Sequence, residues 1–308
     1  MTMSLRIAAI IPVYNRPTLI LDAMMSVARQ SHAPTCMIVV DDGSTDQTAV
    51  IAEKWIEDMN LPFECKFIKQ ANQGVAAARN HGVQQAGDCD LLAFLDSDDL
   101  WPECYLQRMV DTFTANPDAV ACSSDRVDHD RQQPKKDDHH DLRWVSDQTT
   151  SHMLGHGSPG TPNTIVKRTA YDQVGGYDPN EKCGEDYQLF LRISLLGKWC
   201  HVPGQPVMVR RNLEAQKQSA PQLSRQFADR RLRLARILDR FIQADGGKAI
   251  VPEKVWKKRV GRLYFAAGRL AIKHKDFATA REALDKAHSY LPGHLRTRWL
   301  LWQLSRLS

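Results

Sequence analysis

The chain has 308 residues, of which 43% are hydrophobic and 25% charged, with a formal net charge of +5; this is the ordinary composition of a globular protein with a full core. No apolar run approaches the roughly 18 residues that a membrane-spanning helix needs, and the N-terminal run Ala8–Val13 is too short for the apolar core of a signal peptide. The seven cysteines are odd in number and scattered without a Cys-x-x-Cys pair, which argues against a disulfide framework or a zinc site and favours reduced thiols in the cytoplasm.

The first part of the chain alternates strand-like and helix-like segments. The predicted strands are short apolar runs, and the predicted helices fill the intervals between them. This alternation predicts an α/β fold with a mostly parallel sheet covered by helices. The predicted strands are Arg6–Val13, Met37–Asp41, Phe63–Ile68, Leu91–Leu95 and Ala119–Ser123, and the predicted helices are about Thr18–Gln30, Thr45–Asp58, Val75–Ala86 and Glu103–Ala115.

The middle of the chain is less regular. Residues 128–143 are highly charged and show neither a helical nor a strand period, so we interpret them as a solvated loop. Regular structure is expected to resume near Gly160, with a strand at Asn163–Lys167, a helical turn at Thr169–Val174 and a helix at Tyr187–Leu196.

Charge divides the chain near residue 215. Residues 1–215 carry 20 Lys and Arg against 29 Asp and Glu, whereas residues 216–308 carry 21 against 7. We therefore expect a domain at 1–215 and a basic helical region at 216–308. Such a basic region implies an anionic neighbour, which could be the acidic half itself, an anionic membrane, an acidic glycan or a nucleic acid.

The basic region is predicted to be helical throughout, with helices at Gln222–Gln243, Pro252–His274 and Leu295–Leu307. In the first helix, Phe227, Leu234, Leu238 and Phe241 share a face. A further set of small and aromatic residues falls at the spacing of one tetratricopeptide-type helix pair, which would need neighbours to pack on and could support an oligomer. This set is Tyr264, Gly268, Phe277, Ala280, Leu284, Ala287 and Pro292.

Polar residues follow the predicted strands at the edge where parallel α/β sheets bind ligands. Asp96 and Asp98 stand on a turn after a buried strand, where two carboxylates repel each other unless a cation lies between them. Oxygen ligands suit Mg²⁺ or Mn²⁺, although an acidic turn also arises by chance. The second acidic strand end, Asp41–Asp46, could accept from a nucleotide base or ribose, or Ser44 or Thr45 could cap the next helix.

Two further positions suggest chemistry. Arg79, on the helix that follows Gly74, could pair with Asp96 or Asp98 or face a phosphate. Asp186 precedes a predicted helix, where the helix dipole favours its ionised form at neutral pH. It could act as a general base or serve as a helix cap.

Five stretches, in order, resemble the family 2 glycosyltransferases, and their order makes a chance resemblance improbable. Together they cover about residues 5–212. The stretches are IIPVYNR (10–16), VVDDGSTDQT (39–48), NQGVAAARNHG (72–82), LLAFLDSDDLWP (91–102) and VGGYDPNEKCGEDYQLFLRI (174–193).

The resemblance implies the A-type glycosyltransferase fold, in which a Rossmann-like nucleotide half joins an acceptor half. It implies hexosyl transfer from a nucleotide-diphosphate sugar, often uridine diphosphate-linked, with Mn²⁺ or Mg²⁺ and with inversion by a single displacement. It places Asp98 as the metal ligand and Asp186 as the general base. The nucleotide-binding residues are then Pro12, Tyr14, Asp42, Gly74, Arg79 and Asp96, and the candidates for contact with the diphosphate or acceptor are Glu185, Arg210 and Arg211.

One position departs from the family pattern. Many relatives carry an Arg-x-His-like segment after the last core strand, and here Asn212 stands near the histidine. Arg210 or Arg211 could compensate at the diphosphate.

The favoured interpretation is a cytoplasmic transferase that acts on a glycan or lipid-linked acceptor in cell-surface polysaccharide assembly. Such an enzyme could bind the inner face of the membrane as a peripheral protein. No nucleic acid partner is expected. The alternative is an inactive nucleotide-sugar-binding scaffold that works through its helical tail, against which the intact Asp96, Asp98 and Asp186 argue. A nucleotidyltransferase would need a glycine-rich phosphate loop near the N-terminus, and residues 12–15 do not form one.

Overall fold

The computed structural model describes residues 5–128, 149–210 and 229–306. The chain divides into two compact units, one of residues 1–149 and 159–221 and the other of residues 150–158 and 222–308. Each unit is described by itself. The domain boundary expected at residue 215 and most of the solvated loop expected at 128–143 lie outside the described residues.

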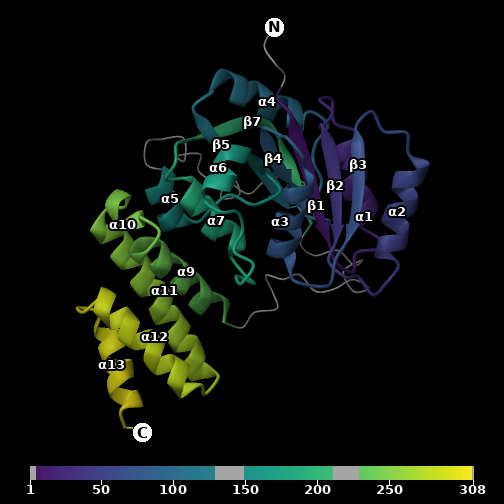
Figure 1. Ribbon diagram of the computed structural model, residues 1–308. Coiled ribbons are helices and arrows are strands. Elements are labelled where there is room, and N and C mark those ends of the chain that lie inside the picture. The colour runs from purple at the N-terminus through teal and green to yellow at the C-terminus, as the bar shows by residue number, and fades with distance from the viewer. Residues whose placement is uncertain (1–4, 129–148, 211–228, 307–308) are drawn as a thin grey trace. The chain divides into compact units, whose positions relative to one another are not determined.

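The first unit is built on a seven-stranded sheet (Figure 1). Its order is β3-β2-β1-β4-β6-β5-β7. Strands β1 to β4 are parallel neighbours, β6 runs antiparallel to β4 and β5, and β7 is parallel to β5. The expected mostly parallel α/β fold is thus confirmed. The strands are β1 Ile7–Val13, β2 Cys36–Asp41, β3 Glu64–Lys69, β4 Leu91–Phe94, β5 Ala119–Asp128, β6 Thr164–Lys167 and β7 Lys198–Val209.

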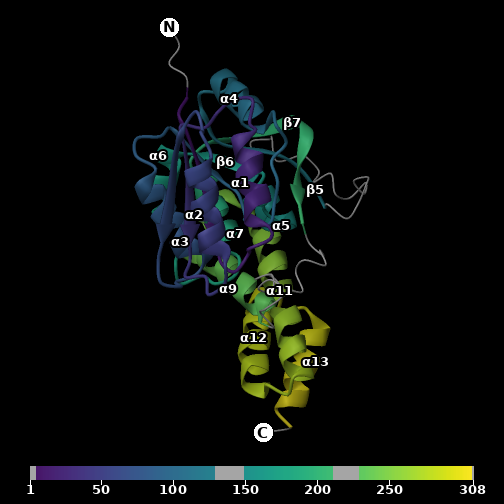
Figure 2. The same cartoon turned by 90° about the vertical axis from the view of Figure 1, so that its right-hand side faces the viewer.

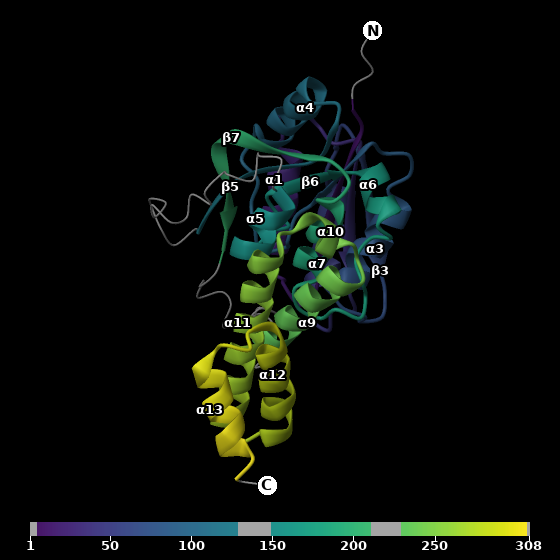
Figure 3. The same cartoon turned by 90° about the vertical axis from the view of Figure 1, so that its left-hand side faces the viewer.

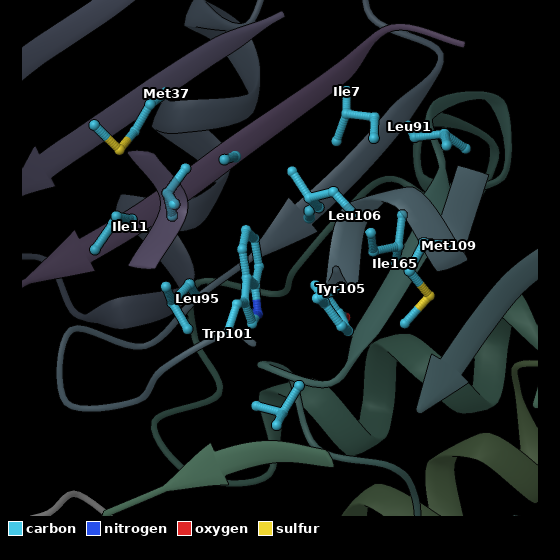
Figure 4. Packing of buried hydrophobic residues seen from close by; sticks show 14 of the residues in the cluster. Ile7, Ile11, Met37, Leu91, Leu95, Trp101, Tyr105, Leu106, Met109 and Ile165 are labelled. Carbon is cyan, nitrogen blue, oxygen red and sulfur yellow. The ribbon is translucent and has the colours of Figure 1, made fainter. Parts of the chain in front are cut away.

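Helices cover both faces of the sheet, and α1 and α2 lie together on one of them (Figure 2). That face carries the main core, in which alternate residues of the strands meet apolar side chains of α1 and α4. Trp101 stacks on Tyr105 there with ring centroids 4.9 Å apart (Figure 4). The helices of this unit are α1 Ile20–Ala28, α2 Thr48–Asp58, α3 Val75–Gln85, α4 Tyr105–Ala115, α6 Arg168–Gln173 and α7 Glu185–Ile193.

Helix α3 packs on the opposite face at close range. A Cβ atom on Gly82 would lie 2.5 Å from Cγ2 of Ile10 and 3.3 Å from Cγ2 of Val40. Only a residue without a side chain allows this approach. The small residues of the stretch NQGVAAARNHG therefore set the distance between α3 and strands β1 and β2, and with it the position of the charged residue Arg79.

Three elements were missed by the sequence analysis. Strand β7 contains Pro203, Gly204 and Pro206, which are depleted in strands, so its pattern did not indicate a strand. The Arg108 guanidinium binds the carbonyl oxygens of Pro203 and Gln205 at 2.7 and 2.6 Å and holds this irregular part. The other missed elements are the helices α5, Thr149–His156, and α10, Gly247–Ile250.

The second unit is helical, and Figure 3 shows α11, α12 and α13 side by side. Gly268 of α11 permits the contact with α12, because a Cβ atom there would lie 2.7 Å from Cγ of Leu284. In the first helix Leu238 and Phe241 are buried as expected, but Leu234 is only half-buried, and Phe227 lies outside the described residues. Besides α5, most of which falls in this unit, the helices are α9 Arg230–Gln243, α10 Gly247–Ile250, α11 Glu253–Lys273, α12 Phe277–Tyr290 and α13 Leu295–Leu304.

The set of residues at tetratricopeptide spacing falls on α11 and α12. Tyr264, Ala280, Leu284 and Ala287 are buried, whereas Phe277 is 45% exposed. The likeness to that repeat stays a prediction. Within the described parts of the chain, the structure contains no helix that combines the length and apolarity needed to cross a membrane.

Candidate functional site

Three strand-end loops meet at one edge of the sheet, as expected for parallel strands. The backbone N–H of Asn15, after β1, donates to Ser44 Oγ at 2.9 Å, and the N–H of Thr45 donates to Asn15 Oδ1 at 2.9 Å. The Arg16 guanidinium lies 4.0 Å from the Asp98 carboxylate, after β4. These contacts join the loops that follow β1, β2 and β4.

The loop after β2 differs in one detail from the prediction. Asp41 accepts from the Ser44 N–H at 3.2 Å and supports the turn, as expected. The predicted helix cap by Ser44 or Thr45 is wrong, because α2 begins at Thr48, whose N–H bonds to Asp46 Oδ1 at 2.9 Å. The Ser44 hydroxyl instead accepts from the loop after β1.

Asp42 organises the loop that leads into α3. Its buried carboxylate accepts hydrogen bonds from the side chain of Gln70 at 2.8 Å and from the backbone N–H groups of Gln73 and Gly74 at 2.9 and 2.8 Å. Gly74 has φ +95°, a conformation that glycine adopts most readily. Asp42 and Gly74 are thus in direct contact. Pro12 lies in β1 opposite Val40 of β2.

The positive charge between the acidic residues is the guanidinium of Arg79. Its side chain is 3% exposed and donates to Asp96 Oδ1 at 2.7 Å and to Glu185 Oε1 at 2.9 Å. It also lies over the Tyr177 ring, 5.1 Å from the centroid. Of the alternatives left open by the sequence, the ion pair with Asp96 is the one formed.

The other two carboxylates of the turn after β4 are more strongly perturbed. Burial and the charge of Asp96 raise the pKa of Asp98 to about 6, although Arg16 acts in the opposite direction. Burial and the charge of Asp98 raise the pKa of Asp99 well above its usual range. Burial and mutual repulsion therefore both disfavour the ionised forms of these two carboxyl groups.

The end of β7 reaches the same turn. Leu100 and Met208 exchange backbone hydrogen bonds at 2.9 and 3.0 Å, and the N–H of Arg210 donates to Asp99 Oδ1 at 3.0 Å. The Arg210 guanidinium donates to Asp22 of α1 at 2.8 Å, a pair that the sequence analysis did not predict. Arg211 and Asn212 lie outside the described residues.

The predicted base stands at the first turn of α7. This helix begins at Glu185, two residues before the predicted start, directly after Gly184 with φ +86°. Asp186 Oδ1 accepts from the Tyr187 N–H at 2.7 Å. Burial and the charge of Glu185 raise the pKa of Asp186 to about 6. At neutral pH such a carboxyl is still mostly ionised, as expected, but burial and a like charge oppose the ionised form that the helix dipole favours.

Sequence reasoning missed the support beneath Arg79. The side chain of Asn80 binds the backbone of Tyr177 twice, with Nδ2 donating to the carbonyl at 2.8 Å and Oδ1 accepting from the N–H at 3.0 Å. The Tyr171 hydroxyl donates to the same Oδ1 at 2.5 Å. Asn80 and Tyr177 both lie inside the stretches quoted above. The sequence therefore contained both residues in family motifs, but it did not show that they bind each other.

The donor set of the turn after β4, carboxylate oxygens, is of the kind that suits a divalent cation. Among the residues that the structure describes, no three His, Cys, Asp or Glu side chains gather around one metal position. Mg²⁺ is commonly bound by one or two carboxylates together with substrate phosphates, so a full protein cage is not required. Burial and the charge of Asp96 disfavour the ionised form of Asp98, whose pKa is about 6, whereas Asp96 pairs with Arg79.

Comparison with known proteins agrees with this geometry. Residues 8–175 match the family described as Glycosyl transferase family 2. An uncharacterized glycosyltransferase of Nostoc is 38% identical over 187 residues, which are 57% of this chain and 55% of that protein. The chain thus spans about half the length of this relative.

Solved structures share the fold. TarS of S. aureus in complex with UDP-GlcNAc superposes with a TM-score of 0.71 at 18% identity, over 94% of this chain and 82% of that chain. A mannosyltransferase from Pyrobaculum calidifontis in complex with GDP-Man and Mn²⁺ superposes with a TM-score of 0.60 at 22% identity, over 99% and 81%. At these identities the likeness establishes the A-type glycosyltransferase fold.

Proposed function

Because the chain belongs to glycosyl transferase family 2, we propose that it transfers a sugar from a nucleotide-diphosphate sugar to an acceptor hydroxyl by a single, inverting displacement. The observation that carries this proposal is the contact of Arg79 with Asp96 and Glu185. Through this one guanidinium, the acidic turn after β4 is linked to Glu185 in the first turn of α7, and Glu185 is the sequence neighbour of Asp186.

The donor is placed at the strand-end loops. In this proposal Pro12, Tyr14, Asp42 and Gly74 surround the nucleoside, for which uridine is favoured. The hydrogen bonds of Asp42 to the loop before α3 hold that loop in one shape before the donor arrives. This rigidity lowers the entropy that binding would otherwise lose. Tyr14, 38% exposed, is open to stacking.

Asp98, assisted by Asp96, is the proposed holder of Mn²⁺ or Mg²⁺. The cation, when bound, supplies Lewis-acid stabilisation of the charge that develops on the departing diphosphate. Arg79 holds the Asp96 carboxylate in place through its 2.7 Å contact. Arg210 and Arg211 are the proposed further cations for the diphosphate.

Asp186 is the proposed general base. A carboxylate with a pKa of about 6 is a better proton acceptor than an ordinary aspartate and is still mostly ionised at neutral pH. The hydrogen bond from the Tyr187 N–H leaves the second carboxylate oxygen for the acceptor. Glu185, fixed on Arg79, raises the basicity of Asp186 by its negative charge.

The acceptor in this proposal is a hydroxyl of a glycan or of a lipid-linked saccharide. A hydroxyl needs a base at neutral pH, and Asp186 provides one. Assembly of a cell-surface polysaccharide at the cytoplasmic face of the membrane fits such a reaction.

A panel of nucleotide sugars tests the proposal. Each donor is added with Mn²⁺, with Mg²⁺ or with a chelator, and thermal stabilisation and donor hydrolysis are measured. We expect one donor to raise the melting temperature only in the presence of a cation. Asp98→Asn should lose this dependence, while Asp58→Asn, an exposed aspartate at the end of α2, should retain it. A flat response across all donors would favour the scaffold interpretation.

A further inference from the structure

Helix α13 carries apolar side chains on two opposite faces. On the first face, Leu304 is 5% exposed, and Leu300 and Leu301 pack beside it. They contact the small apolar cluster that α11 and α12 form, which includes Ala280 and Leu284. This first face is the apolar stripe that a surface helix ordinarily packs against the core.

The second face is exposed. Leu295, Trp299 and Trp302 are 73%, 56% and 49% exposed, and they recur at positions i, i+4 and i+7, so they lie on one side of the helix. We name these three residues the tryptophan face. Two large aromatic side chains are thus exposed on the side of the helix that faces away from the core. An exposed apolar patch of this kind is typical of a surface that binds an apolar partner.

Arginines border the tryptophan face. Arg296 and Arg298 are exposed on α13, and the Arg306 guanidinium lies 3.7 Å from the centre of the Trp302 ring. From Lys286 to Ser308 the sequence holds four Lys and Arg and neither Asp nor Glu. Apolar and cationic groups are thus presented together, without a carboxylate nearby in the sequence.

We propose that the tryptophan face and its arginines dock α13 on the surface of an anionic lipid bilayer, with the helix lying in the interface. Tryptophan is enriched at the level of lipid head groups, and arginine is attracted by anionic head groups. A helix with one aromatic face and cationic borders is the type that lies in this plane. A second copy of the chain suits the face less well, because two cationic surfaces would repel each other. The inference does not depend on the transfer reaction.

A flotation assay on the full chain tests the docking surface. Vesicles of phosphatidylcholine alone are compared with vesicles that contain phosphatidylglycerol, at low and at high salt. We expect binding only to the anionic vesicles, with a strong decrease as salt shortens the Debye length. Removal of the charges by Arg296→Gln, Arg298→Gln and Arg306→Gln should lower the partition coefficient roughly hundredfold, at about fivefold for each cation. Trp299→Ala with Trp302→Ala should lower it on the order of tenfold or more.

Matched variants separate this surface from the general charge of the unit. Lys254→Gln, Lys258→Gln and Arg262→Gln remove the same charge from exposed positions of α11, and we expect less than a roughly threefold effect. Ile250→Ala with Phe277→Ala removes exposed apolar area elsewhere in the unit and should also have little effect. The proposal is overturned if both charge triples weaken binding equally, if the tryptophan variant binds normally, or if light scattering shows a tryptophan-dependent oligomer without vesicle binding.

Discussion

At Asp186 we expect stability and the proposed function to conflict. The pKa of this carboxyl lies at about 6 in the folded protein, against an ordinary value of 3.8, because of burial and the charge of Glu185. Between these two pH values the folded state binds a proton that the unfolded chain releases. The free energy of unfolding therefore falls as pH rises through this window, and the loss is complete above about pH 6.

The size of the effect follows from the shift. A shift from 3.8 to about 6 corresponds to roughly 3 kcal/mol for a fully buried group. Asp186 retains partial exposure, so solvent screening reduces the expected value to about 1–2 kcal/mol. Asp186→Asn removes the charge and keeps an oxygen for the Tyr187 N–H. We expect it to raise the free energy of unfolding by about 1–2 kcal/mol at pH 8 and by about half as much at pH 5.

Urea unfolding of the full chain at both pH values measures this gain, and hydrogen exchange of α7 and β4 reports on the first unit separately. Glu185→Gln is the matched control. It should act in the opposite direction, by about 1–2 kcal/mol, because the loss of a partner of the buried Arg79 outweighs the relief of repulsion on the partly exposed Asp186. A loss of stability in Asp186→Asn at pH 8, or a gain that does not change with pH, would refute the reasoning.

Three further predictions concern activity and packing. Asp98→Ala should abolish transfer and cation-dependent donor binding with the fold intact, as circular dichroism and calorimetric titration would show; near-normal turnover would contradict the metal assignment. Asp186→Asn should retain donor affinity and lose turnover by roughly a hundredfold or more, and lost affinity at unchanged saturating turnover would make it a binding residue. Gly82→Ala should lower stability by about 1–2 kcal/mol because its Cβ meets Ile10, whereas Gly155→Ala, a helical glycine with open space around it, should be neutral or slightly stabilising in the same melt.

The parallel part of the sheet could be predicted because each strand is a continuous apolar run that ends in polar residues. Leu91–Phe94, buried on both faces, is an example, and the acidic turn after it was located from the same pattern. Strand β7 could not be predicted, because its prolines and glycine are unfavourable in isolated strands. It is held by contacts from a distant helix, such as those of Arg108 with the carbonyls of Pro203 and Gln205.

The sequence indicated which polar residues belong to the site more readily than it indicated which of them bind each other. The sequence left Arg79 free to pair with Asp96, Asp98 or a phosphate, and nothing in its spacing indicated Glu185, which is 106 residues away. The partners of Arg79 are determined by the tertiary structure. The close packing at Gly82 fixes the position of α3, and the start of α7 supplies Glu185 as a second carboxylate. Likewise, only the fold shows that burial outweighs the helix dipole at Asp186.

Arg79 also explains how this site can hold two perturbed carboxylates. The pKa values of Asp98 and Asp186 are both raised to about 6, so folding disfavours the ionised form of each carboxyl group. Arg79 pairs with their neighbours, Asp96 and Glu185, and thereby reduces the repulsion that these two carboxylates exert on Asp98 and Asp186. In the proposed reaction, a bound cation would offset the charge of Asp98 and the proton of the acceptor hydroxyl would neutralise Asp186. A ligand that brings a cation to Asp98 or donates a proton to Asp186 therefore gains affinity, because it stabilises a carboxylate that the folded chain alone stabilises poorly.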